Sequence, residues 1–150
     1  MYQLFKGYVP TKDKKCTMSF KGKTSDELLS LRDASKYEEF AGILNDNTIL
    51  IDVDEEDQSE IMMRIVEDKQ LACRVYQTTR GKHFLFKNDD RCDKNWIKQS
   101  LACGLKSDGK LGSRTSYSVL KYGGKDRKII YDIYPDEDYD TVPKWMLPVK

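Results

Sequence analysis

The sequence is poor in the residues on which several common kinds of site depend. It has one histidine, His83, and four cysteines with no Cys-x-x-Cys pair among them. A structural zinc site needs several closely spaced Cys or His ligands, so this composition argues against one. The thiols are therefore expected to be reduced and unpaired. A single histidine also excludes rolling-circle initiation by paired histidines.

Long apolar runs and a signal-peptide pattern are also missing. No stretch reaches the ~20 apolar residues of a membrane span, and the first residues, MYQLFKGYVPTKDKK, do not resemble a secretory signal. Hydrophobic residues make up 39% of the 150 residues and charged residues 34%, which suits one soluble globular domain. We therefore expect a cytoplasmic protein with no membrane partner.

Charge is distributed unevenly although the net charge is only +1. Residues 75–130 contain 13 Lys and Arg against 5 Asp, whereas residues 54–57 are all acidic and residues 131–140 carry five acids and no base. A basic half beside an acidic cluster suits a polyanion held next to metal ions. An ordinary solvated surface is the alternative interpretation.

The most informative segment is Thr48-Ile49-Leu50-Ile51-Asp52-Val53-Asp54. Side chains alternate along a strand, so Asp52 and Asp54 are expected on one face, with Cα atoms about 6.5–7 Å apart, and Ile49, Ile51 and Val53 on the other. Two carboxylates at the end of a buried strand can hold Mg²⁺ or Mn²⁺. The same pattern alone also occurs where a strand simply ends.

A second polar cluster opens the next hairpin, in Arg80-Gly81-Lys82-His83-Phe84-Leu85-Phe86. Three potential phosphate donors, Arg80, Lys82 and His83, meet at a glycine turn, as binding of a nucleotide triphosphate requires. Alternation places His83 with Leu85 on one face and Lys82 with the two phenylalanines on the other. A purely structural histidine is the competing interpretation.

A third carboxylate would complete a site for two metal ions, which clamp the attacking and leaving oxygens of a phosphoryl displacement. Asp108 follows a short apolar segment and precedes Gly109-Lys110. Asp132 also follows an apolar segment and is the other candidate. The residues alone do not choose between them.

Periodicity predicts an α+β protein. Strands are expected at 2–9, 48–54, 72–78, 82–87, 105–108, 115–121 and 128–133, and helices at 24–31, 35–40, 57–66 and 93–103. From residue 48 the order β-α-β-β-α-β predicts a ferredoxin-like mixed sheet, of the kind found in RNA-recognition motifs, preceded by an N-terminal αβ unit.

The ordered set of motifs resembles the archaeo-eukaryotic primase superfamily, in particular the primase-polymerase domains of phage and mobile-element replication proteins. Asp52 and Asp54 match its first motif, Gly81-Lys82-His83 its second (small-x-His), and Asp108 its third, because the sequence from Lys110 to Leu120 resembles the segment that follows that motif. Tyr8-Val9-Pro10-Thr11-Lys12 also resembles the N-terminal strand of phage members. The resemblance covers nearly the whole chain.

The resemblance implies a catalytic domain, residues 1–150, that joins NTPs or dNTPs on a DNA template and primer during phage or mobile-element replication in a bacterial host's cytoplasm. Asp52, Asp54 and Asp108 would hold two Mg²⁺ or Mn²⁺ ions, and Arg80, Lys82 and His83 would bind the nucleotide. Since family members usually continue into a helicase or helical accessory domain, we expect the N-terminal part of a longer protein.

Basic residues elsewhere in the chain could guide the nucleic acid. The candidates are Lys106, Lys110, Arg114 and Lys121. Two other functions remain open: a metal-dependent nuclease that uses the same carboxylates, and a non-catalytic module that binds single-stranded nucleic acid by stacking.

Overall fold

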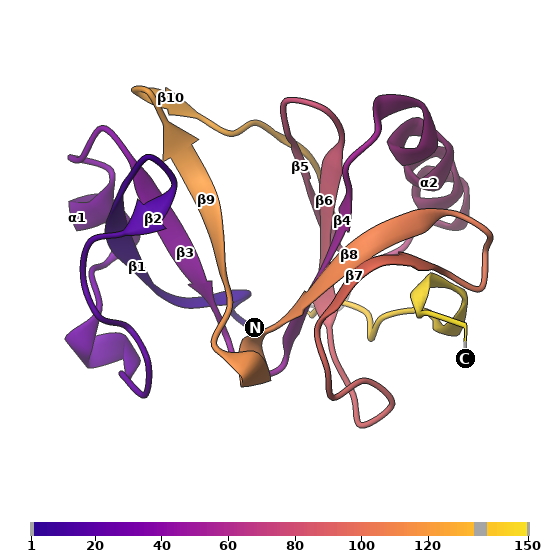
Figure 1. Cartoon of the computed structure of the whole chain (residues 1–150), viewed down its shortest axis with the longest axis horizontal. Helices are drawn as coiled ribbons and strands as arrows, with labels where there is room; N and C mark the ends of the chain where they lie inside the picture. Colours follow the sequence, from indigo (N-terminus) through magenta and orange to yellow (C-terminus); the bar gives the residue numbers. More distant parts are fainter. Residues whose placement is uncertain (1, 134–137, 150) are drawn as a thin grey trace.

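The computed structural model describes residues 2–133 and 138–149, and these form two sheets with few helices (Figure 1). Sheet 1 has the strand order β10-β9-β3-β1-β2, and sheet 2 the order β11-β5-β6-β4-β8-β7. The strands of sheet 1 are β1 (Phe5–Lys12), β2 (Lys15–Cys16), β3 (Phe40–Leu44), β9 (Tyr117–Tyr122) and β10 (Lys125–Asp126). Those of sheet 2 are β4 (Thr48–Val53), β5 (Arg74–Gln77), β6 (Lys82–Lys87), β7 (Trp96–Ser100), β8 (Lys106–Leu111) and β11 (Ile129–Asp132).

The helical elements are short except for one. They are α1 (Leu31–Ala34), α2 (Glu56–Lys69) and the 3₁₀ turns η1 (Ser25–Glu27), η2 (Gly112–Arg114) and η4 (Lys144–Met146). Within the described part of the chain, no helix is long and apolar enough to cross a membrane. Because the described residues form both helices and two sheets, the predicted α+β class is correct, with strands as the main component.

Strand β4 is buried on both faces, and this divides the core. Ile49, Ile51 and Val53 pack with Met62 and other residues beneath α2, which covers the outer face of sheet 2 (Figure 1). Leu50, on the opposite face, packs into a second cluster that both sheets share, with Tyr76 and Leu85 from sheet 2 and Phe5, Leu44 and Leu120 from sheet 1. The alternation predicted for this strand is confirmed, and full burial of each such side chain contributes about 1.5–3 kcal/mol.

Every pairing between named strands is antiparallel, so the expectation of a mixed sheet is wrong. Strands β4 and β5 are both antiparallel to β6, which lies between them. They therefore run parallel to each other, and α2 is the crossover that joins them.

The helix predicted at 93–103 is absent, and β7 occupies the segment instead. Its apolar residues had helical spacing, but Ile97 is 73% exposed. Trp96 lies against Gly109 of β8, where a β-carbon would come within 2.3 Å of the indole, and its Nε1–H donates to Ser107 Oγ at 3.1 Å. This long-range packing decides the conformation.

The N-terminal helices were also placed wrongly. The capping box of Thr24 and Glu27 forms, but it opens only the short turn η1, and α1 follows at Leu31–Ala34. No helix spans 35–40, since Phe40 begins β3. By contrast, the strand at 82–87 is confirmed, and the four cysteines are free as expected.

Candidate functional site

Three of the predicted residues form one row across sheet 2. Asp52 of β4 lies opposite His83 of β6 on one side and opposite Asp108 of β8 on the other. Directly opposed residues of antiparallel strands share a face, so the three side chains emerge together. Ser118 of β9 lies within 3.4 Å (Oγ to Nδ1) of His83, and the row therefore faces sheet 1.

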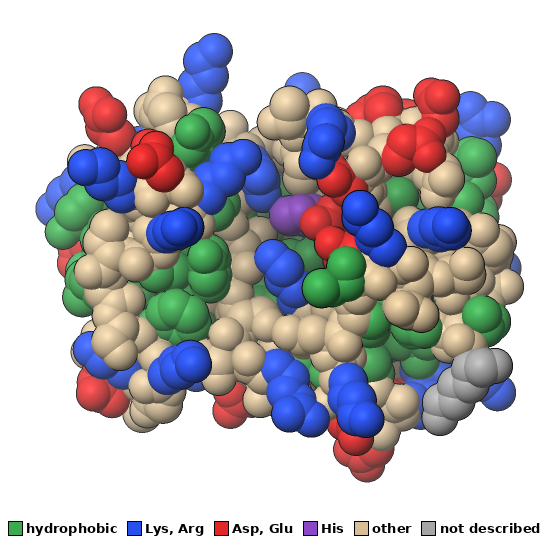
Figure 2. Space-filling model, in the orientation of Figure 1, with side chains coloured by type: hydrophobic (Ala, Val, Ile, Leu, Met, Phe, Trp, Pro, Cys, Tyr) green, Lys and Arg blue, Asp and Glu red, His purple; other side chains and the backbone are tan. Residues whose placement is uncertain are grey.

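Asp52 and Asp54 line one pocket of about 220 Å³, as the alternation predicted. The other lining residues are Lys14, Thr78, Thr79, Arg80, His83 and Arg127. Figure 2 shows the histidine in the hollow between the two halves of the molecule, with acidic and basic side chains around it. The pocket joins side chains from four segments far apart in the sequence.

His83 lies directly beside Asp52 on the neighbouring strand. Its Nε2 is 3.4 Å from Asp52 Oδ1, and its side chain is buried between that carboxylate and Ser118. The sheet register causes this, because the two residues are Cα partners on neighbouring strands.

The carboxylate of Asp52 is held in its charged form. Burial raises its pKa, but the hydrogen bond and charge of His83, with the charges of Lys110 and Arg127, outweigh burial and leave the pKa below its ordinary value. An ionised carboxylate that is only partly exposed is suited to bind a hard cation.

The lowered pKa makes a prediction about acid stability. A folded-state pKa below the ordinary value of about 4 adds stability above that pH and loses it as pH falls through the folded pKa. The free energy of unfolding should therefore drop more steeply below about pH 4 in the wild type than in Asp52→Asn. Urea unfolding across the acid range measures this, with Asp68→Asn, on exposed α2 surface, as the control. Parallel curves for wild type and Asp52→Asn would contradict it.

Asp54 follows β4 and is paired with Arg80 of the β5–β6 turn, at 2.7 Å. The side chains are 50% and 74% exposed, so water competes for both charges and the pair adds little stability. Arg80 can therefore exchange Asp54 for another anion at small cost. It stands where a phosphate-binding residue was predicted.

The structure contradicts the prediction that Lys82 binds phosphate. Lys82 is 1% exposed and lies on the face of β6 that is covered by α2. Its ammonium contacts Glu56 and Glu60 at 2.8 and 2.7 Å, away from the pocket. The alternation of β6 explains the placement, because neighbouring His83 faces the other way.

Two basic residues of the pocket escaped the sequence analysis, Lys14 and Arg127. Lys14 also lies over the ring of Tyr122, with Nζ 4.9 Å from the centroid. Arg127 belongs to the connection that crosses from sheet 1 to sheet 2 between β10 and β11 (Figure 1). A basic stretch was visible at 125–128, but only the fold brings it to the carboxylates.

The guanidinium of Arg127 is available for a ligand. Burial lowers its pKa and the charge of Asp52 raises it, yet an arginine remains cationic. Among the residues that the structure describes, its side chain makes no hydrogen bond or ion pair. A half-buried arginine at a pocket, attracted by Asp52 but without a side-chain hydrogen bond in the part of the chain that the structure describes, can donate to an anion.

The third carboxylate, Asp108, lies within β8 and does not end a strand as expected. Its Oδ1 accepts a hydrogen bond of 2.7 Å from the backbone N–H of Lys98, which has φ of 48° and forms a bulge in β7. Asp132 lies on β11, with β5 and β6 between it and β4. It pairs with Arg74 at 3.2 Å and accepts from Tyr139 Oη at 2.7 Å.

The candidate nucleic-acid residues divide into two groups. Lys106 and Lys110 flank Asp108 at two-residue spacing and so share its face of β8. Arg114 donates to the carbonyl of Asp93 at 2.8 Å, and Lys121 to that of Ser35 at 3.1 Å. None of the four lysines and arginines lines the pocket, but Lys106 and Lys110 share a strand face with Asp108, whereas Arg114 and Lys121 bind backbone carbonyls elsewhere.

The donors present suit Mg²⁺ or Mn²⁺, since all three are carboxylates. Within 2–133 and 138–149, however, no three His, Cys, Asp or Glu side chains stand close enough together to hold a metal ion. Asp54 accepts a hydrogen bond from the Arg80 guanidinium, and Asp108 accepts one from the backbone N–H of Lys98. The residue types fit Mg²⁺ or Mn²⁺, but a metal site would form only if Asp54 and Asp108 left these donors and turned toward Asp52.

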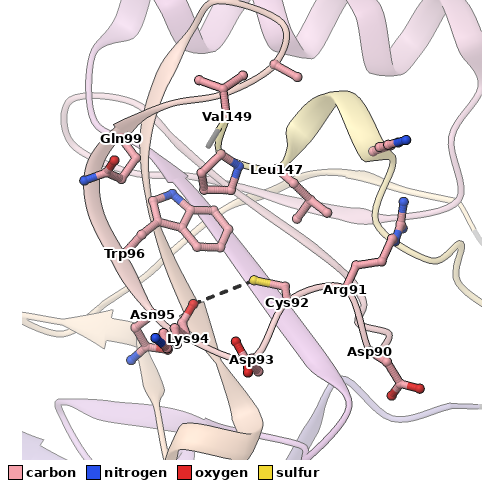
Figure 3. Close-up of a pocket in the computed structure, with 13 residues that line it drawn as sticks. Asp90, Arg91, Cys92, Asp93, Lys94, Asn95, Trp96, Gln99, Leu147 and Val149 are labelled. Atoms are coloured by element: carbon pink, nitrogen blue, oxygen red, sulfur yellow. Dashed lines mark hydrogen bonds between the residues drawn. The ribbon is translucent and has the colours of Figure 1, made fainter.

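A larger cavity of about 850 Å³ lies on the other face of sheet 2 (Figure 3). Trp96, Cys92 and Leu147 project into it, and charged side chains such as Arg91 stand at its edge. None of the predicted site residues lines it. Its apolar walls lack the convergent carboxylates of the smaller pocket, which we therefore take as the candidate site.

Comparison with protein-family models, curated proteins and solved structures found no match to this chain.

Proposed function

We propose that the protein is a template-directed nucleotidyltransferase, a DNA primase-polymerase catalytic domain that acts on NTPs or dNTPs in phage or mobile-element replication in the bacterial cytoplasm. The observation that carries the proposal is the row of His83, Asp52 and Asp108 across three adjacent strands. Asp54 and two cations that the sequence analysis missed, Lys14 and Arg127, line one pocket with Asp52 and His83.

The strand order supports the primase-like fold. Strands β8-β4-β6-β5, with α2 joining β4 to β5, have the order and directions of the four strands of a ferredoxin-like β-α-β-β-α-β unit. Strand β7 replaces the second helix of that unit. The N-terminal strands β1, β2 and β3, together with β9 and β10, form the facing sheet, where an N-terminal αβ unit was expected.

The acidic residues would perform the chemistry. Asp52, Asp54 and Asp108 would hold two Mg²⁺ or Mn²⁺ ions, which activate a 3′-hydroxyl and neutralise charge at the α-phosphate when bound. Asp52 is suited to this because its pKa is lowered. Asp54 and Asp108 would each release their present hydrogen-bond donor.

The basic residues would bind the substrates. Arg80, Lys14 and Arg127 line the pocket and would contact the triphosphate together with His83, in place of buried Lys82. Lys106 and Lys110, on the same face of β8 as Asp108, would guide the primer or template backbone toward the carboxylates. A helicase or helical accessory domain would supply further grip on the template.

Primer extension tests the function directly. The wild type, with Mn²⁺, a primed DNA template and labelled dNTPs or NTPs, should lengthen the primer, and Asp52→Asn should reduce incorporation by at least about a hundredfold. Strand cleavage in place of extension would favour the nuclease. DNA binding without either reaction, unaffected by Asp52→Asn, would favour the non-catalytic module.

A further inference from the structure

A buried lysine ties helix α2 to the strand that carries His83. Lys82 donates from Nζ to Glu56 Oε1 at 2.8 Å, Glu60 Oε1 at 2.7 Å and Ser59 Oγ at 3.1 Å. These bonds use all three protons of the ammonium. All three acceptors lie in the first turns of α2.

A second set of bonds extends the link into the β5–β6 turn. The amide nitrogen of Gln77 donates to Glu56 Oε2 at 3.0 Å and to the carbonyl of Gly81 at 2.8 Å. The N–H of Gly81 donates to Thr78 Oγ1 at 3.1 Å. The start of α2, the turn and the start of β6 are thus one hydrogen-bonded unit, which we call the Lys82 clamp.

The clamp adjoins the pocket residues on both sides. Asp54 lies between the end of β4 and the start of α2, two residues before Glu56. Arg80 lies in the turn, two residues before Lys82, and His83 is the next residue of β6. The clamp therefore adds side-chain links between the segment that carries Asp54 and the strand that carries His83, beyond the β4–β6 ladder.

Stability alone gives little reason for a lysine here. Glu56 and Glu60 are 47% and 60% exposed, so their pairs with Lys82 are partly screened by water. Removing one partner of a buried pair is costly when the other charge is left buried, but here both glutamates are largely exposed and water would solvate them after Lys82→Met. Burial lowers the pKa of Lys82, but the hydrogen bonds to both glutamates raise it above the ordinary value, so the side chain stays charged.

We propose that Lys82 is a positioning residue, whose three hydrogen bonds set the spacing between Asp54 on the α2 side and His83 on the β6 side. The inference rests on the proposed function for the identity of the site. It assigns to the middle residue of Gly81-Lys82-His83 a role on the opposite face of the strand from the substrate.

The single histidine offers a direct readout, because its imidazole gives one well-separated NMR signal. In metal-free Lys82→Met this signal should move relative to the wild type, and Mg²⁺ should shift it only at about tenfold or more higher concentration, the scale for loss of a residue that orients a metal ligand. Lys87→Met is the matched control: Lys87 ends the same strand and pairs with Asp138 at 2.9 Å. Thermal unfolding confirms that both variants fold.

The outcomes separate the two proposals. A wild-type signal that does not respond to Mg²⁺ or Mn²⁺ would count against the proposed metal site, whereas the metal-free comparison would still test the clamp. A folded Lys82→Met with an unmoved histidine signal would overturn the positioning role. If Lys82→Met does not fold, Glu60→Gln, which weakens one bond from a largely exposed side chain, serves for the same comparison.

Discussion

Asp108→Asn is expected to reduce Mn²⁺-dependent incorporation by about three orders of magnitude, a loss typical of removing a group that stabilises charge in a catalytic site. Asp132→Asn should keep most of the activity. The reason is position: Asp108 is the Cα partner of Asp52 and shares its face, whereas Asp132 is separated from β4 by two strands.

Asparagine is a suitable replacement at both positions. At 108 its carbonyl oxygen can still accept the hydrogen bond from Lys98 N–H, so the β7 bulge should persist and only the charge is lost. At 132 the change removes the ion pair with Arg74, and some stability should be lost without effect on the pocket. Primer extension and urea unfolding on both variants separate these effects. An active Asp108→Asn beside an inactive, folded Asp132→Asn would reverse the assignment.

Local patterns predicted those elements whose conformation is set by burial of the segment itself. Strand β4 has apolar residues on both faces until Asp52, so its two-residue alternation identified it and the shared face of its two carboxylates. Segment 93–103 carried a helix-like pattern, but its conformation depends on Trp96 lying against Gly109, thirteen residues away. No periodic pattern of apolar residues in the sequence predicts that contact.

The same division applies to the candidate site: local patterns pointed to some of its residues, and long-range packing supplied the others. Asp52 and His83 were found because strand ends with carboxylates or a glycine turn are visible locally. Lys82 was misassigned although a signal existed: it shares its face with Phe84, which predicts burial. Arg127 and Lys14 reach the pocket only because sheet 1 faces sheet 2, a long-range arrangement that motif spacing does not reveal.

Gly81→Ala should destabilise the protein and disorganise the site, because this glycine lies against the end of β4. A β-carbon there would come within 1.8 Å of the carbonyl oxygen of Val53 and 3.0 Å of the backbone nitrogen of Glu55. Backbone atoms on both sides cannot move aside as the tip of a side chain can. The turn must separate from β4, at a cost of about 2–3 kcal/mol or more.

Gly22→Ala provides the comparison, since a β-carbon there meets nothing within 4 Å and only the backbone conformation, φ of 69°, is unfavourable. That change should cost only about 1 kcal/mol and leave incorporation intact. Urea unfolding at neutral pH measures both, and equal stability of the two variants would contradict the close-approach argument. Separation of the turn would also carry Arg80 and His83 away from Asp54, so a folded fraction of Gly81→Ala should have lost incorporation as well. The glycine at position 81 is then required by its contact with β4, because any side chain at that position holds the turn that carries Arg80 too far from Asp52 and Asp54.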